Sequence, residues 1–307
     1  MKNKIASFGE IVWDSFGNTE TLGGAPLNFA YFCTKFGCDA AIISAVGRDR
    51  FGKAALEKIS ENSINADAVI VHETLPTGIV DVGKGPDGLP EYDIRRPAAW
   101  DEIALTPAAK AIVARCEAFC FGTLSQRSPV SAGTLKELLK ILPKHCLKVF
   151  DANLRQKYFN REVLNFSLSN ADILKLNDAE LPIVFETIFA KKSPDFDIAA
   201  NAILDGYPSL KYLVCTIGAE GHIIYGRGIT PLRGLPKPVE VVDTVGAGDA
   251  FTAGFVSAVL GGAGIEAQSA RRNLRHLHVH AEELSDNFIS AKNILWFALF
   301  RGSHPQI

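Results

Sequence analysis

The sequence has no Cys-x-x-Cys pair, no long apolar run and no excess of basic residues. Its six cysteines are scattered, so the spacing typical of zinc and redox sites is missing, and buried, reduced thiols are expected. The formal net charge is −2 at pH 7, which argues against nucleic acid or an anionic membrane as a partner. Residues 294–300 are too few to span a bilayer, and residues 1–14 lack the apolar core of a signal peptide. We therefore expect a cytoplasmic protein.

Two familiar phosphate-binding motifs are also missing. No G-x-G-x-x-G joins an early strand to a helix, and no G-x-x-x-x-G-K-[ST] loop occurs. The chain instead alternates short β-rich runs with amphipathic segments. We expect strands at 5–12, 40–47, 118–123, 148–153, 172–177 and 212–218, and helices at 25–37, 51–62, 131–142 and 177–189. This spacing indicates βαβ units, and hence an α/β fold with a mostly parallel sheet that binds ligands beyond the carboxyl ends of its strands.

The stretch 67–98 departs from that alternation. Its Pro and Gly residues and its alternating β pattern predict two or three antiparallel strands without a helix between them. Together with residues 12–24 it is expected to form a small β lid. We therefore expect a single domain over residues 1–307, with this lid as its one addition.

The stretch GGAPLNFA, residues 23–30, precedes an amphipathic helix. Its glycines allow the backbone to approach a ligand closely, and Asn28, about one turn into the helix, could donate to and accept from a polyol. Asp14 could accept a hydrogen bond from a sugar hydroxyl if it faces Asn28. The alternative is an ordinary glycine turn, with Asn28 on the solvent face and Asp14 as a cap or turn residue.

Two further motifs follow predicted strands. Asn177 and Glu180 have an i, i+3 spacing that suits either a hydrated Mg²⁺ ion with phosphates or a helix capping box. Thr216, Gly218 and Gly221 could contact nucleotide phosphates, or could form a simple turn between two strands. The sequence alone leaves both pairs of alternatives open.

The stretch DTVGAGDAFTAGF, residues 243–255, reads as a strand end, a tight turn and a helix start. Gly246, Ala247 and Gly248 could direct consecutive N–H groups at one anion, reinforced by the helix dipole. A phosphoryl group in transfer carries negative charge that such a cradle stabilises. Asp249 beside it is either a helix cap or a base that takes a proton from an attacking hydroxyl.

In this order, the four motifs closely resemble those of the ribokinase-like (PfkB) sugar kinase family. GGAPLNFA and DTVGAGDAFTAGF are similar to its two signatures, and the resemblance covers residues 4 to about 262. It implies a ribokinase-like three-layer α/β/α domain with a β lid, ATP as phosphoryl donor, Mg²⁺ as cofactor and a small sugar as acceptor. A homodimer formed through the lid is an arrangement that the resemblance allows.

The resemblance also implies a role for each motif. Asp249 is expected to be the catalytic base, with Gly246, Ala247 and Gly248 as the anion hole. The sugar is expected to be held by Asp14, Gly24, Asn28 and Arg155. Asn177 and Glu180 are expected to bind a Mg²⁺ ion through water. ATP is expected to be bound by Asn177, Thr216, Gly218 and Gly221.

The acceptor is expected to be fructose, because GEIVWD, FGTLSQR and FDANLRQKY are most similar to fructokinases. The pattern Asp151-x-Asn153-x-Arg155 is shared with 2-keto-3-deoxygluconate kinases, in which the matching arginine faces the acid substrate. A keto-deoxy sugar acid is therefore the alternative acceptor, and Arg155 is expected to reach either one.

Past Gly262 the resemblance ends. Residues 263–307 replace the small, hydroxyl-rich helix that flanks the adenine in the family, and place His276, His278 and His280 at every second position without a carboxylate pattern that would support a metal site. A reading-frame slip is one explanation, because a back-translation of Asn273–His280 read two bases along gives Pro-Ser-Ala-Phe-Thr-Cys-Thr. The alternative function is therefore a non-catalytic sugar-binding protein, disabled by this segment.

Overall fold

The computed structural model describes residues 2–17, 19–84, 90–234 and 246–262. The predictions for residues 263–307, including the three histidines, lie outside the described residues, as does the start of the stretch 243–255. The six cysteines all lie within the described ranges, and they are buried free thiols, as expected. None of the described helices is both long enough and apolar enough to span a bilayer.

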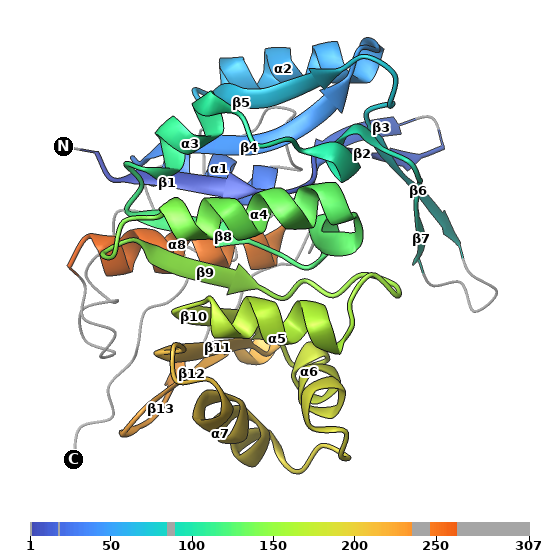
Figure 1. Cartoon of the computed structure of the whole chain (residues 1–307). Helices are drawn as coiled ribbons and strands as arrows, with labels where there is room; N and C mark the ends of the chain where they lie inside the picture. The colour runs from blue at the N-terminus through green and yellow to red at the C-terminus, as the bar shows by residue number, and fades with distance from the viewer. Residues whose placement is uncertain (1, 18, 85–89, 235–245, 263–307) are drawn as a thin grey trace.

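A nine-stranded sheet forms the centre of the molecule, in the order β13-β12-β11-β10-β9-β8-β1-β4-β5 (Figure 1). Seven strands pair in parallel, as the sequence predicts: β1 (Lys4–Phe8), β4 (Asp39–Gly47), β5 (Asn65–His72), β8 (Ala118–Phe121), β9 (Leu147–Asp151), β10 (Ile173–Asn177) and β11 (Tyr212–Thr216). Two antiparallel strands extend one edge, β12 (His222–Gly226) and β13 (Ile229–Gly234). The carboxyl ends of the parallel strands therefore meet at one edge of the sheet.

Helices cover both faces of this sheet. One face carries α1 (Ala25–Lys35), α2 (Arg50–Glu61) and α8 (Ala247–Leu260), and the other carries α3 (Pro107–Val113), α4 (Pro129–Ile141), α5 (Arg161–Ser169), α6 (Glu180–Phe189) and α7 (Phe196–Gly206). Short 3₁₀ turns lie at η1 (Ala99–Glu102), η2 (Leu124–Arg127) and η3 (Gly218–Glu220).

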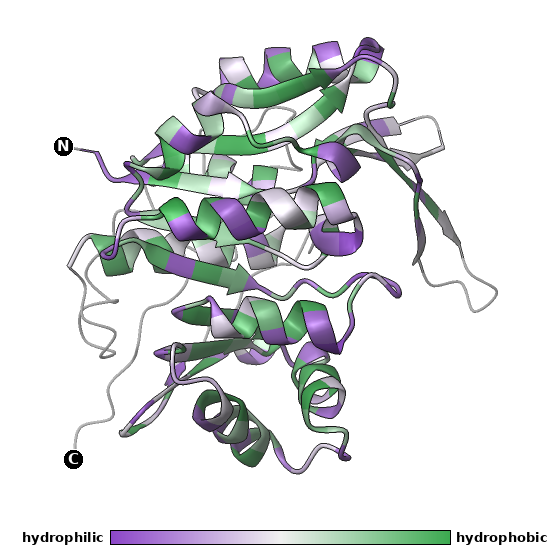
Figure 2. Ribbon diagram, in the orientation of Figure 1, coloured by the Kyte–Doolittle hydropathy of each residue, from purple (hydrophilic) through white to green (hydrophobic). Residues whose placement is uncertain are grey.

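Two apolar clusters lie one on each side of the sheet, because successive strand residues point to opposite faces. In β8, Phe119 and Phe121 join one cluster, while Ala118 and Cys120 join the other. The strands of the large sheet are accordingly apolar on both faces, whereas polar residues gather on the outer sides of the helices (Figure 2). The three-layer α/β/α architecture with a mostly parallel sheet is thus confirmed.

A separate four-stranded sheet projects beside the body, in the order β3-β2-β6-β7 (Figure 1). Its strands are β2 (Val12–Phe16), β3 (Thr19–Gly23), β6 (Gly78–Lys84) and β7 (Pro90–Ile94), and we call it the lid. The predicted strand at 5–12 is in fact two strands, since β1 ends at Phe8 and the chain then turns into the lid.

The predicted lid range 67–98 is wrong at its start. Residues 67–72 belong to β5, which pairs in parallel with β4 at the edge of the large sheet. β5 contacts α2 on one side and α3 on the other, and only Ala68 within it is fully buried. An outer strand that is partly covered shows the same alternation as a strand of an antiparallel flap, which explains the error.

Candidate active site

Asp249 and Asn28 meet where the first turns of α8 and α1 lie side by side. Asn28 Nδ2 donates to Asp249 Oδ2 over 2.8 Å, although 221 residues separate them. Asn28 is buried, so the alternative of a solvent-facing asparagine is wrong. Its Oδ1 is buried without a hydrogen-bond partner, and it is therefore an acceptor available to a ligand hydroxyl.

The surroundings of Asp249 raise the pKa of its carboxyl. Burial raises its pKa to about 7, and the negative charge of Asp151 adds to this rise. Lys175, the Asn28 hydrogen bond and Arg155 act in the opposite direction. A carboxyl whose pKa is near 7 can accept a proton and release it again near neutral pH, as a general base must.

Backbone N–H groups beside Asp249 are without a hydrogen-bond partner inside the helix. Gly246 has φ of 79°, a left-handed conformation that suits glycine, and α8 begins directly after it. The first N–H groups of a helix have no partner within it, and no side chain from the described residues caps this end. Ala247 and Gly248 thus point consecutive donors outward, as an anion cradle requires.

The lid contributes Asp14 to the same place. A Cβ on Gly23 would lie 3.2 Å from Asp14 Oδ2 and 4.0 Å from Asn28 Oδ1, so the two side chains converge at this glycine. Burial raises the pKa of Asp14 to about 6, and Arg155 opposes that rise. Gly24 has φ of 111°, and a Cβ there would lie 2.4 Å from the Glu10 carbonyl oxygen, so this position requires glycine.

Glu10 is a residue that the sequence analysis missed. It is buried at the turn from β1 to β2, where burial raises its pKa to about 7 while Arg155 lowers it and Asp249 raises it. It lines a pocket together with Asp151 and Asn153. The sequence does contain a sign of this residue, namely a carboxylate within the apolar run SFGEIVW. Arg155 is exposed, and its positive charge lowers the pKa of Glu10, Asp14 and Asp249.

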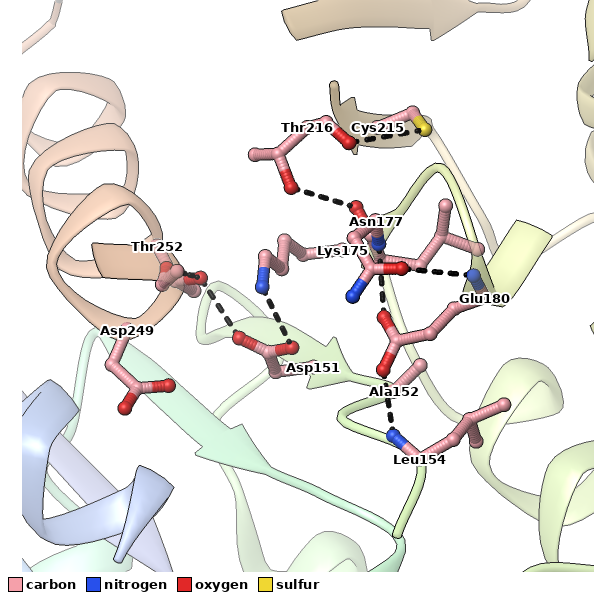
Figure 3. Close-up of polar contacts among 12 residues, drawn as sticks. Asp151, Ala152, Leu154, Lys175, Asn177, Glu180, Cys215, Thr216, Asp249 and Thr252 are labelled. Atoms are coloured by element: carbon pink, nitrogen blue, oxygen red, sulfur yellow. Dashed lines mark hydrogen bonds and ion pairs between the residues drawn. The ribbon is translucent and has the colours of Figure 1, made fainter. Parts of the chain in front are cut away.

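Asn177 and Glu180 exchange the two hydrogen bonds of the capping box that the sequence allowed, although α6 begins only at Glu180, with Ala179 at its N-cap position. Asn177 Oδ1 accepts from the Glu180 N–H over 2.8 Å, and Glu180 Oε2 accepts from the Asn177 N–H over 2.9 Å (Figure 3). Glu180 Oε1 accepts from the Leu154 N–H over 2.7 Å. Among the described residues there is no cluster of three or more metal-ligating side chains. Because both carboxylate oxygens are engaged by N–H groups, the pair fits a hydrated Mg²⁺ ion reached through water better than a directly ligated one.

Thr216, Gly218 and Gly221 lie next to this pair. Thr216 ends β11 opposite Asn177 of β10, at the carboxyl edge of the sheet. The turn alternative describes the backbone correctly, since the Gly221 N–H donates to the Gly218 carbonyl and β12 returns antiparallel. The turn nevertheless places these residues at the edge where Asp249 also lies.

Lys175 is a second residue that the sequence analysis missed. It lies on β10 and is buried, and its Nζ is 3.3 Å from Asp151 Oδ1 at the end of β9. Asp151 Oδ2 in turn accepts from the Thr252 hydroxyl on α8 over 2.9 Å. Figure 3 shows this chain of contacts between Asp249 on one side and the Asn177–Glu180 pair on the other. A lysine within the apolar run DILKLN was the available signal.

Comparisons with known proteins show the family to which the chain belongs. A family model described as "pfkB family carbohydrate kinase" matches residues 2–271. Fructokinase-2 of Solanum habrochaites is 27% identical over 288 residues, which are 87% of this chain and 85% of that protein.

Solved structures share the fold. Fructokinase with bound ATP from Xylella fastidiosa has a TM-score of 0.77 at 22% identity, covering 96% of this chain and 98% of that chain. An E. coli structure in complex with ATP and Mg²⁺ has a TM-score of 0.74 at 22% identity, covering 87% of this chain and 89% of that chain. With the family match spanning most of its length, this chain belongs to the pfkB family of carbohydrate kinases.

Proposed function

We propose that this sugar kinase transfers the γ-phosphoryl group of ATP to a hydroxyl of fructose, with Asp249 as the general base. The observation that carries the proposal is the contact between Asn28 and Asp249 beside the open N-terminus of α8. That contact brings a sugar-binding group, a proton acceptor and an anion cradle to one point. The ATP-bound fructokinase structure with the same fold supports the choice of donor.

The residues divide the reaction between them. Asp14 and Asn28 orient the sugar, and Asp249 takes the proton of its attacking hydroxyl. The amides of Gly246, Ala247 and Gly248 stabilise the charge on the phosphoryl group in transfer. Closure of the lid excludes water, which would otherwise compete with the sugar for that group.

The triphosphate of ATP lies, in this proposal, along the carboxyl edge of β10 and β11. Thr216 and the turn at Gly218 and Gly221 contact it, and Asn177 and Glu180 hold the hydration shell of a Mg²⁺ ion. When bound, the ion neutralises phosphate charge. The E. coli structure with ATP and Mg²⁺ supports this pairing of ligands.

A neutral sugar suits the acceptor site better than a sugar acid. The Arg155 guanidinium acts on three carboxyls of the protein, those of Glu10, Asp14 and Asp249. An acidic substrate would have to approach those same carboxyls, which repel it. This balance of charge favours fructose over 2-keto-3-deoxygluconate, whose kinases share the Asp151-x-Asn153-x-Arg155 pattern.

The test is a coupled assay of ADP release with ATP, Mg²⁺ and fructose, 2-keto-3-deoxygluconate or ribose. We expect the highest kcat/KM with fructose. A preference for the sugar acid would overturn the choice of acceptor, and the Arg155→Met variant would then lose that preference. Failure to release ADP with any sugar would overturn the kinase proposal itself.

A non-catalytic sugar-binding protein is the second candidate, because the family match stops at residue 271 of 307. This candidate predicts that fructose raises the melting temperature while no ATP is consumed. Calorimetric titration with fructose and with an ATP analogue, separately and together, distinguishes it from the kinase.

A further inference from the structure

The ammonium group of Lys175 lies directly against the first turn of α8. A Cβ built on Gly248 would be 2.8 Å from Lys175 Nζ, so the ammonium group lies against the backbone of this glycine. The lysine side chain is 9% exposed. A positive charge thus lies immediately beside the amides that form the proposed anion hole.

The ammonium group of Lys175 has more hydrogen-bond donors than it has partners among the described residues. Within the described part of the chain its one ion-pair partner is Asp151, at 3.3 Å, whereas an ammonium group has three donors. For Asp151 Oδ1, the contact with Lys175 is likewise the one interaction seen among the described residues. Burial lowers the pKa of Lys175, but Asp151, Glu180 and Asp249 outweigh this and raise it, so the group stays charged.

A purely structural role explains this arrangement poorly. Removing a lysine and an aspartate from water costs about as much free energy as their attraction returns, so a buried pair adds little net stability. The Lys175–Asp151 ion pair is also held by a third residue, because the Thr252 hydroxyl on α8 donates to Asp151 Oδ2. An isolated salt bridge does not require such a contact. Thr252 stands three residues after Asp249, so the same helix holds both groups.

We propose that Lys175 is a catalytic residue that binds the phosphoryl group in transfer, and that Asp151 and Thr252 position it. The proposal rests on the kinase function argued above. As the sugar oxygen bonds to the γ-phosphorus, the bond from that phosphorus to the bridging oxygen breaks, and its electron pair leaves with ADP. The proton of the sugar hydroxyl passes to Asp249, while Lys175 keeps its own protons and stabilises the oxygens of the phosphoryl group.

The experiment compares Lys175→Met, which removes the charge, with Lys175→Arg, which retains it. Lys148→Met is the matched control, because Lys148 pairs with Asp172 away from the candidate site. We expect Lys175→Met to lower kcat about 10²–10³-fold, as loss of one transition-state donor does elsewhere. The fructose dissociation constant, measured by calorimetry, should change less than about threefold, since Lys175 does not bind the sugar. Lys175→Arg should recover part of the loss, and Lys148→Met should leave kcat unchanged.

Thr252→Val and Thr252→Ser test the positioning role with less risk to folding. Valine keeps the shape and removes the donor to Asp151, so kcat should fall while the fructose dissociation constant stays the same; serine should retain kcat. A folded Lys175→Met variant with wild-type kcat would overturn the inference and leave the kinase function standing. Wild-type protein that phosphorylates no sugar would instead overturn both.

Discussion

At the scale of single residues, Asp249 has the environment of a tuned base. Burial raises its pKa, and three neighbours lower it, namely Lys175, Asn28 and Arg155. The outcome is a pKa of about 7, in the range where one carboxyl can both accept and release a proton. Glu10 has a similar pKa, but its backbone hydrogen bonds come from its own residue and from Ala25 at the start of α1 rather than from α8.

The pH dependence of kcat/KM for fructose tests this tuning. Because the base must be deprotonated, activity should be constant above about pH 8 and fall roughly tenfold per pH unit below about pH 6. Lys175→Met removes a charge that lowers the pKa of Asp249, so its acidic limb should move to higher pH. Glu10→Gln removes a neighbouring carboxylate whose charge interacts with that of Asp249, so its acidic limb should move in the opposite direction, to lower pH. A limb near pH 4, typical of an exposed carboxyl, would contradict the account.

At the scale of elements, the candidate site lies between the carboxyl ends of β9, β10 and β11 and the start of α8. The capping arrangement between Asn177 and Glu180 fixes where α6 leaves β10. Glu180 also accepts from the Leu154 N–H, so it ties the segment after β9 to the start of α6. The local structure therefore depends on this one carboxylate, whatever its part in binding Mg²⁺.

Glu180→Ala should destabilise the fold, because it leaves the N–H groups of Asn177 and Leu154 without an acceptor. Each unsatisfied group costs about 1–3 kcal/mol, so a loss on the order of 2–4 kcal/mol is expected from urea unfolding. Glu180→Gln keeps one carbonyl acceptor and should lose less. A loss below about 0.5 kcal/mol for alanine would show that water replaces both contacts.

Sequence patterns predict the elements better than they predict the site. The strands and helices, and the motifs around Asn28 and Asp249, are local patterns, and the structure has them close to the expected positions. The misplaced strand β5 shows the limit, because an outer parallel strand and a flap strand alternate alike. Lys175 and Glu10 were missed because their chemistry comes from neighbours remote in sequence, such as Gly248 and Arg155.

At the scale of the whole molecule, one buried and two partly buried carboxyls from different segments gather at the candidate site. Glu10, Asp14 and Asp249 have pKa values raised to about 7, 6 and 7, with burial as the main cause. Each group binds its proton more tightly in the folded than in the unfolded chain. The stability that these protons contribute is complete at pH values below the ordinary carboxyl pKa and is lost as the pH rises through the folded values.

Asp249→Asn should therefore change stability in a pH-dependent way. At pH 5 both the wild-type carboxyl and the amide are neutral in the folded state, whereas at pH 8 only the wild type carries a buried charge. The variant should gain on the order of 1–3 kcal/mol relative to wild type between pH 5 and pH 8. Urea unfolding of both proteins at the two pH values measures this difference. An equal change at both would contradict the raised pKa.

The most direct test of the central claim combines turnover and binding in Asp249→Asn. Fructose binding should persist, with a dissociation constant within about threefold of wild type, because Asn28 and Asp14 remain. Phosphorylation of fructose should fall about 10²–10⁴-fold, since the proton of the attacking hydroxyl has no acceptor. A variant that binds fructose and phosphorylates it at the wild-type rate would show that Asp249 is not the base.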